Sequence, residues 1–252
     1  MATTSKAKSA SPTPDVEKSR DDEHQHLLQT LPREESWISS SASMYLYQGF
    51  WCSARGLKPV ISFQRHFQAF DSDVMVASFP KCGTTWLKAL TFSTLYRDRF
   101  ARGQNPLLAS NPHQLVPFLE LNVYLNNPCP DLDNIFRLYK PRLFATHVSY
   151  ASLPTSIKDS KWVPFTEDEE KGGVVEEIAN ICSFETLKEL EVNKKGILSS
   201  VGIPVPHKDF FRTGKVGDWS NHLTPSMVER LEKLMHEKFD NSGLTFKLSS
   251  ET

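Results

Sequence analysis

One stretch, residues 73–90 with the sequence DVMVASFPKCGTTWLKAL, limits the possible folds of this chain more than any other. It begins with the short apolar run 74–77, which is typical of a buried strand. A turn of small and polar residues follows, and a helical pattern of apolar residues starts at Trp86. A tight strand-to-helix turn leaves backbone N–H groups unpaired at the start of the helix, and these groups attract anions. The stretch therefore predicts a phosphate cradle, in which Lys81 adds a cation and Gly83 allows close approach of the main chain.

This turn differs from a Walker A loop. The Walker A pattern GxxxxGK[ST] places its lysine after the second glycine, whereas Lys81 precedes the single Gly83. A strand–turn–helix joint with one glycine is often only a structural connection. The residues by themselves therefore leave two interpretations open, a phosphate cradle and a plain joint.

The composition is that of an ordinary globular protein, with 39% hydrophobic and 23% charged residues. A length of 252 residues allows one sizeable α/β domain or two small ones. The formal net charge of -1 gives no electrostatic reason to expect nucleic acid or an anionic membrane as a partner. No apolar run approaches the ~18 residues that a membrane span needs.

The cysteines and the N-terminal segment both favour a cytoplasmic location. The four cysteines are widely spaced and include no CxxC pair, which argues against a disulfide framework or a zinc site. Residues 1–40 are polar, lack the apolar core of a secretory signal, and are too acidic for a transit peptide. We expect this segment to be a disordered tail. No ligand cluster in the sequence indicates a metal ion.

A second apolar run, 143–145, predicts another short buried strand, with Thr146 and His147 directly after it. In open parallel sheets, ligands bind beyond the carboxyl ends of the strands. His147 should then face the same crevice as Lys81. A histidine at the end of a strand can be a structural hydrogen-bonding residue or a general base, and position alone does not choose between them.

The string PKCGTTWLK resembles the nucleotide-binding loop of the cytosolic sulfotransferases, especially the plant branch. Members of that family transfer a sulfuryl group from 3′-phosphoadenosine 5′-phosphosulfate (PAPS) to a hydroxyl or amine. The resemblance implies that Trp86 stacks on the adenine. It also implies that the 5′-phosphosulfate end is held by Lys81, Cys82, Gly83, Thr84 and Thr85.

Two further segments are similar to parts of this family. The segment PRLFATHVSYASLP resembles one in which a Thr-His pair supplies the general base, which implies that role for His147. The segment DFFRTGKVGDW resembles the second glycine-bearing cofactor loop, which reaches the 3′-phosphate. That likeness implies cofactor contacts from Arg212, Thr213 and Gly214, with Thr213 in place of the usual lysine.

The chain also departs from the family. After residues 156–160 the family continues into a strand and an RNPKD motif, whose arginine, together with a later serine, binds the 3′-phosphate. Here residue 161 leads directly into a segment that resembles a much later part of the family. We therefore expect a sulfotransferase domain over residues 41–252 that is internally truncated near 161–164. The expected fold class is α/β, a P-loop-like parallel sheet flanked by helices and missing central elements.

Two functions follow from the resemblance. The first is a sulfotransferase, with PAPS as co-substrate and a small hydroxylated metabolite as acceptor, in which His147 and Lys81 are catalytic. The second is an inactive truncated member that binds nucleotide weakly or pairs with an intact relative. The sequence leaves the identity of the acceptor and the oligomeric state open.

Overall fold

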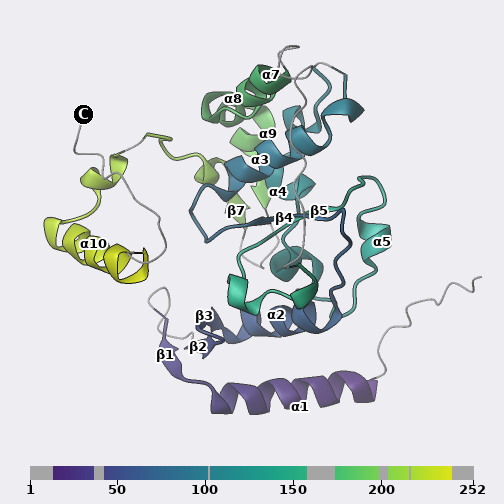
Figure 1. The fold of residues 1–252 in the computed structure, drawn as a ribbon, viewed down its shortest axis with the longest axis vertical. Coiled ribbons are helices and arrows are strands. Elements are labelled where there is room, and N and C mark those ends of the chain that lie inside the picture. The colour runs from purple at the N-terminus through teal and green to yellow at the C-terminus, as the bar shows by residue number, and fades with distance from the viewer. Residues whose placement is uncertain are drawn as a thin grey trace, which may run out of the picture. The chain divides into compact units, whose positions relative to one another are not determined.

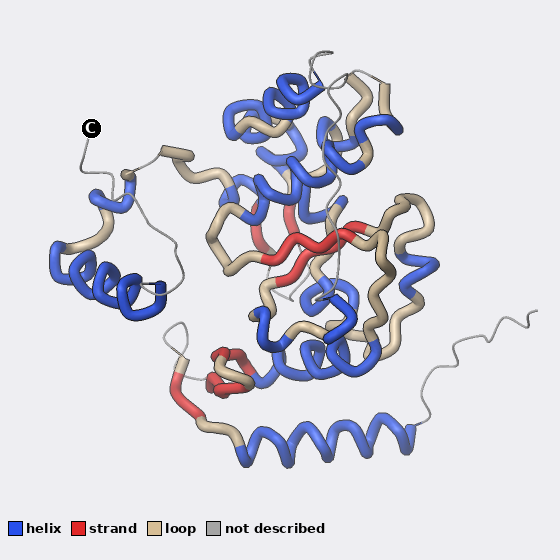
Figure 2. Tube along the Cα trace, in the orientation of Figure 1, coloured by secondary structure: helices blue, strands red, loops and turns tan. Residues whose placement is uncertain are grey.

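The computed structural model describes residues 14–36, 43–101, 103–157, 174–198, 204–215 and 217–239. The chain divides into two compact units, Met1–Phe210 and Phe211–Thr252, and each is considered separately. Figures 1 and 2 show the course of the chain and its secondary structure. Among the helices that the structure describes, none has the length and apolar character needed to cross a membrane.

Among the described residues, the first unit contains short strands and several helices, and the second contains α10 (Pro225–Phe239). The helices are α1 (Pro14–Thr30), α2 (Ala54–His66), α3 (Thr84–Leu95), α4 (Pro112–Leu115), α5 (Leu132–Ile135), α7 (Val174–Ile181), α8 (Phe184–Glu189), α9 (Glu191–Lys195) and α10 (Pro225–Phe239), with a π-helical turn at Leu119–Val123. The strands are β1 (Arg33–Glu35), β2 (Ser43–Tyr47), β3 (Phe50–Ser53), β4 (Val74–Ala77), β5 (Leu143–Thr146), β6 (Ile197–Leu198) and β7 (Val205–Pro206).

A parallel pair of strands, β4 and β5, lies at the centre of the first unit (Figure 1). Their register aligns Val74 with Leu143 and Ala77 with Thr146, so the two strands end at the same edge. Every residue of β5 is buried, as expected for a short strand made only of apolar residues and one threonine. This confirms the α/β class and both strands that the sequence predicts. Within the described residues, the parallel sheet has these two strands.

Aromatic side chains form the core on the α2 side of the strands. The rings of Phe67 and Phe144 meet edge to face at 5.2 Å between centroids, and Phe63 packs on Phe67 at 5.3 Å. Leu119 of the π-helical turn is fully buried in the same cluster. Edge-to-face pairs of this kind contribute about 0.5–1.5 kcal/mol beyond the burial of their area. The opposite side of the strands carries α3 (Figure 1).

A buried ion pair joins the residues that precede the two strands. Arg142 donates from Nε to Oδ1 of Asp73 at 2.8 Å and from Nη2 to Oδ2 at 2.5 Å. The guanidinium also donates to the carbonyl of Gln68 at 3.0 Å and lies 4.1 Å from the centroid of the Phe70 ring. Because the pair is bidentate and both side chains are buried, it fixes the start of β4 against the start of β5.

The N-terminal segment differs in part from the disordered tail that the sequence predicts. Residues Pro14–Thr30 form α1, and Glu23 makes an exposed ion pair with Arg65 of α2 at 3.1 Å. The helix begins at a proline, which is favourable at the first helical position, and eight of its 17 residues are good helix formers. The predicted junction near 161–164 lies outside the described residues.

Candidate functional site

The turn between β4 and α3 has the backbone shape of an open cradle. Gly83 precedes α3 in a left-handed conformation with φ 82°, and Lys81 has φ 66°. A positive φ is uncommon for a residue other than glycine and marks a turn of special shape. No side chain caps the start of α3, and Lys81, Cys82 and Gly83 are exposed. The unpaired N–H groups at the start of this twelve-residue helix therefore lie at an exposed turn that carries a cation.

The two threonines of the turn have different surroundings. Thr84 is buried, and its Oγ1 lies 2.7 Å from Oγ of Ser78. Thr85 is half-buried, and its Oγ1 lies 3.0 Å from Nε2 of His113. A buried Thr84 is available to a ligand mainly through its backbone N–H, whereas the hydroxyl of Thr85 is within reach of the surface.

His147 lies at the carboxyl end of β5, beside the start of this turn. Its Nδ1 is 2.6 Å from the carbonyl oxygen of Ser78. A carbonyl oxygen can only accept, so Nδ1 carries the proton and Nε2 of the neutral ring has a lone pair. Burial lowers the pKa of His147, and the nearby charge of Lys88 lowers it as well. The hydrogen bond to Ser78 acts in the opposite direction and raises this pKa. The imidazole is therefore held neutral, with one nitrogen able to take up a proton.

A buried carboxylate holds the backbone that carries this histidine. Glu120 accepts from the backbone N–H of His147 at 2.7 Å and from Oγ1 of Thr146 at 2.9 Å. Burial raises the pKa of Glu120, and these hydrogen bonds partly offset that rise. The sequence analysis missed this residue because it lies in a proline- and asparagine-rich stretch with no periodic pattern.

Below the turn, the structure brings together two more residues that the sequence analysis did not assign. Lys88 is fully buried; its Nζ lies 3.1 Å from Nδ1 of His113 and 3.2 Å from the centroid of the Phe118 ring. In the structure Lys88 shares the face of α3 that carries the buried Thr84, four residues earlier, and only the fold shows that this face is buried. Nothing in the sequence singles out His113 either.

Aromatic side chains surround the exposed side of the turn. Phe50 of β3 stacks on Phe79 of the turn with 6.0 Å between ring centroids. Phe79 and Trp86 are each more than half exposed, at 57% and 52%. The antiparallel β2–β3 hairpin, which holds the aromatic residues that precede the first parallel strand, therefore reaches the turn.

The predicted second cofactor loop lies in the second unit. Arg212 makes an ion pair with Asp218 and donates to Nε2 of His222 at 2.7 Å, while Oγ1 of Thr213 donates to Asp218 at 3.3 Å. Gly214 has a positive φ of 65°. The structure thus gathers Lys81–Thr85 and His147 at one edge, and the association of Arg212–Gly214 with that edge stays a prediction.

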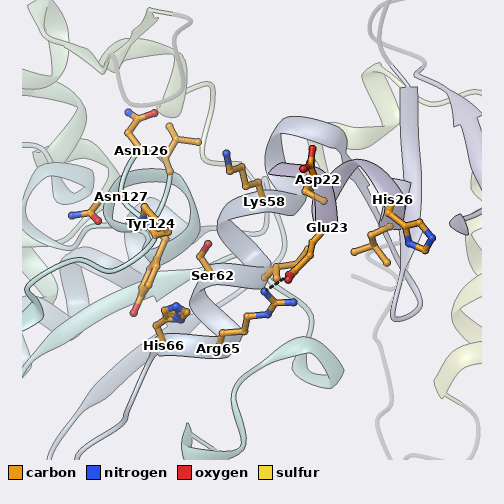
Figure 3. A pocket seen from close by; sticks show the side chains of 15 residues that line it. Asp22, Glu23, His26, Lys58, Ser62, Arg65, His66, Tyr124, Asn126 and Asn127 are labelled. Atoms are coloured by element: carbon orange, nitrogen blue, oxygen red, sulfur yellow. Dashed lines mark hydrogen bonds and ion pairs between the residues drawn. The ribbon is translucent and has the colours of Figure 1, made fainter. Parts of the chain in front are cut away.

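A separate groove of about 1030 Å³ runs between α1, α2 and residues 124–128 (Figure 3). Its lining is mixed in charge, and the ion pair between Glu23 and Arg65 crosses it. None of the predicted site residues lines this groove. We therefore place the candidate site at the turn, where a cation, helix N–H groups and a neutral histidine meet. In the part of the chain that the structure describes, no three metal-ligating side chains come together.

Comparison with known proteins identifies the family of this chain. The sulfotransferase domain family matches residues 71–163 and 160–243. Cytosolic sulfotransferase 15 of Arabidopsis thaliana is 35% identical over 340 aligned residues, covering 94% of this chain and 92% of that protein. Cytosolic sulfotransferase 14 of the same plant is 34% identical over 325 residues, covering 90% of this chain and 91% of that protein.

Solved structures of similar fold include sulfotransferase relatives. A crystal structure of an Arabidopsis thaliana protein named as a sulphotransferase has a TM-score of 0.60 and 27% identity, and covers 94% of this chain and 100% of that chain. Retinol dehydratase, crystallised with androsterone and the inactive cofactor PAP, has a TM-score of 0.50 at 14% identity, covering 94% and 97%, and supports the fold alone.

The alignments also contain a large gap. The 340 positions aligned with Cytosolic sulfotransferase 15 exceed the 252 residues of this chain by 88, so at least that many positions of the relative have no counterpart here. The family match is itself divided into two segments that meet at residues 160–163. With these matches, and with the turn and histidine described above, the chain belongs to the sulfotransferase family, in its plant cytosolic branch.

Proposed function

We propose that this protein transfers the sulfuryl group of PAPS to the hydroxyl of a small acceptor. The observation that carries the proposal is the contact between Nδ1 of His147 and the carbonyl of Ser78, at 2.6 Å. This contact leaves Nε2 unprotonated and holds the ring beside the turn that carries Lys81. A general base and an anion cradle at one sheet edge are the two parts that the reaction requires.

In this proposal His147 removes the proton of the acceptor hydroxyl through Nε2. The acceptor oxygen then forms a bond to sulfur as the bond between sulfur and the 5′-phosphate oxygen breaks. The products are the sulfate ester and adenosine 3′,5′-bisphosphate (PAP). Lys81 and the N–H groups at the start of α3 stabilise the negative charge on the departing phosphate.

The remaining contacts of the nucleotide follow from the family resemblance. The half-exposed Trp86 is available to stack on the adenine, and Cys82, Gly83, Thr84 and Thr85 surround the phosphosulfate. Arg212, Thr213 and Gly214 are the proposed contacts of the 3′-phosphate. The exposed aromatic rings at the turn suit a flat, apolar, hydroxylated acceptor. The names of the relatives support a cytosolic location.

A second function is favoured by the gap in the alignments. A deletion near residues 161–164 would remove the 3′-phosphate motif, and Arg212 is already paired with Asp218. A charge-assisted contact of this kind contributes about 1.5–3 kcal/mol, so its loss weakens nucleotide binding considerably. The alternative is therefore an inactive member that binds nucleotide weakly or pairs with an intact relative.

Calorimetry and a transfer assay distinguish the two functions. We expect PAP to bind the full chain with micromolar affinity and Lys81→Ala to weaken that binding. We also expect labelled sulfate to move from PAPS to a hydroxylated aromatic acceptor. An absence of heat at millimolar PAP, together with no labelled product, would leave the inactive member as the better description.

A further inference from the structure

We propose that Lys88 and His113 act as positioning residues that set the direction of the Thr85 hydroxyl, so that its proton points outward to a bound anion. The inference rests on the proposed function for the identity of the anion, the 5′-phosphosulfate of PAPS. Its geometric basis is the buried chain of contacts from Lys88 through both nitrogens of the His113 ring to Thr85.

The first step is the direction of the contact between Lys88 and His113. The Lys88 Nζ lies over the face of Phe118 at 3.2 Å from the ring centroid, a position that favours the charged ammonium. Burial lowers the pKa of Lys88 well below its usual value, and the carboxylate of Glu120 opposes this shift. The position over the Phe118 ring and the nearby carboxylate are the contacts that favour the ammonium. An ammonium has donors and no acceptor, so Nδ1 of His113 accepts the hydrogen bond at 3.1 Å.

The second step is the tautomer of His113. Burial, together with the charges of Lys88, His147 and His207, lowers the pKa of His113 to about 2. The ring is thus neutral and has one N–H. Since Nδ1 accepts, the proton lies on Nε2, which then donates to Oγ1 of Thr85 at 3.0 Å. Contacts with the rings of Phe118 and Phe210, at 5.5 and 4.5 Å, hold the imidazole in place.

The third step is the proton of Thr85. A hydroxyl has one proton, and here its oxygen already accepts from His113. Thr85 lies in the first turn of α3, where the backbone N–H groups are unpaired. An anionic oxygen held there receives a charge-assisted hydrogen bond from this hydroxyl. Thr84 differs, because either it or Ser78 can donate in their contact.

The geometry gives the two histidines near the turn opposite tautomers. His147 carries its proton on Nδ1 because it donates to the Ser78 carbonyl. His113 carries its proton on Nε2 because Nδ1 accepts from Lys88. This difference can be measured directly and does not depend on catalytic activity.

The first test is nitrogen-15 NMR of the histidine side chains in the full chain without nucleotide, assigned with His113→Gln and His147→Gln. We expect the Nε2–H tautomer for His113 and the Nδ1–H tautomer for His147. In Lys88→Met, a change of similar volume, His113 should lose its single tautomer. An Nδ1–H tautomer for His113 in the unsubstituted protein would overturn the proposal.

The second test measures PAP affinity in a double-mutant cycle, with thermal melting to verify that each variant is folded. We expect Thr85→Val to weaken binding by about tenfold to a hundredfold, while Thr85→Ser keeps most of it. Lys88→Met alone should weaken binding by about threefold to tenfold, because the hydroxyl then turns partly toward His113. In the Thr85→Val background, Lys88→Met should add nothing.

The outcomes separate this inference from the proposed function. An equal effect of Lys88→Met with and without the Thr85 hydroxyl would show that the lysine acts independently, which contradicts the inference. If the unsubstituted protein binds no PAP, the proposed function fails. The tautomer measurement still decides whether Lys88 and His113 orient Thr85.

Discussion

The two ends of the β4–β5 strand pair differ in how their polar groups are used. Before the strands, Asp73 and Arg142 form a buried bidentate ion pair. After the strands, Ser78 and His147 are joined by a single hydrogen bond. The same parallel register produces both pairs, because each pair consists of the residues that flank aligned strand ends.

The two ends of the strand pair therefore have different roles, one in stability and one in function. At the amino ends, the two charged groups pair with each other and with the backbone of Gln68 and Phe70, so this end stabilises the fold. At the carboxyl ends, one nitrogen of His147 is used to fix the ring, and the other can take a proton. Parallel sheets bind ligands at the carboxyl ends of their strands, in agreement with this division.

The largest expected effect is at the carboxyl end. Replacing His147 with Ala should lower kcat/KM for sulfate transfer by roughly 10²–10⁴, because a positioned general base contributes that much. The melting temperature should fall only modestly, since the ring makes one hydrogen bond to the fold and packs on Phe118 with 4.4 Å between ring centroids. The measurement is transfer of labelled sulfate from PAPS, with melting followed by circular dichroism. Equal rates for the variant and the unsubstituted protein would remove His147 from the mechanism.

At the amino end, we expect a substitution to change the stability of the fold instead of the rate of transfer. Arg142→Met should lower the free energy of unfolding by about 3–5 kcal/mol, because it leaves the carboxylate of Asp73 buried and unpaired. Adding Asp73→Asn should restore much of the loss. Denaturant titration measures both.

A matched control is available for this change. Arg65→Met breaks the exposed ion pair with Glu23 and should cost at most about 1 kcal/mol. If Arg142→Met costs no more than this control, the amino end does not have the structural role assigned here.

The pH dependence of transfer sharpens the comparison further. Only the neutral imidazole can act as the base, and burial lowers the pKa of His147 below its usual value of 6.5. The rate should therefore hold as the pH falls from 8 to 6.5 and decrease only at lower pH. Lys88→Met should move this decrease to higher pH, because the lysine charge also lowers that pKa. A fall in kcat/KM that begins well above pH 6.5 would contradict a depressed pKa.

The smallest effect is expected in the second unit. Arg212→Ala should weaken PAP binding by no more than about fivefold, because the guanidinium is exposed and already paired with Asp218. Asp218→Asn should have the opposite sign and strengthen binding, since it releases the arginine for a phosphate. Calorimetry measures both, and a large loss in Arg212→Ala would make this loop as important as the turn.

Local patterns in the sequence were sufficient for several elements. The apolar runs at 74–77 and 143–145 identified β4 and β5. Burial on both faces explains the run in β5, whereas β4 is only partly buried, with Ala77 exposed. The rule that strands of a parallel sheet end at one edge placed His147 near the turn. The segment 14–30 was missed as a helix because its polar composition outweighed its helix-forming residues.

The buried polar residues could not be found in this way. Glu120, Lys88 and His113 come from three different segments, and other segments supply part of their contacts. Glu120 accepts from Thr146 and His147, and Lys88 contacts the Phe118 ring as well as His113. A charged residue in a sequence is expected at the surface. Its burial depends on hydrogen bonds and opposite charges that only the folded chain provides.

The sequence alone determined the α/β class, the glycine turn between a strand and a helix, and membership of the sulfotransferase family. Each of these features depends on a short contiguous stretch, in which the type and spacing of neighbouring residues determine the local structure. The tertiary structure alone decided which nitrogen of His147 carries the proton, and that a buried lysine lies beneath Thr85. Both depend on contacts between segments far apart in the chain, where a shift of about 1 Å makes or breaks a hydrogen bond.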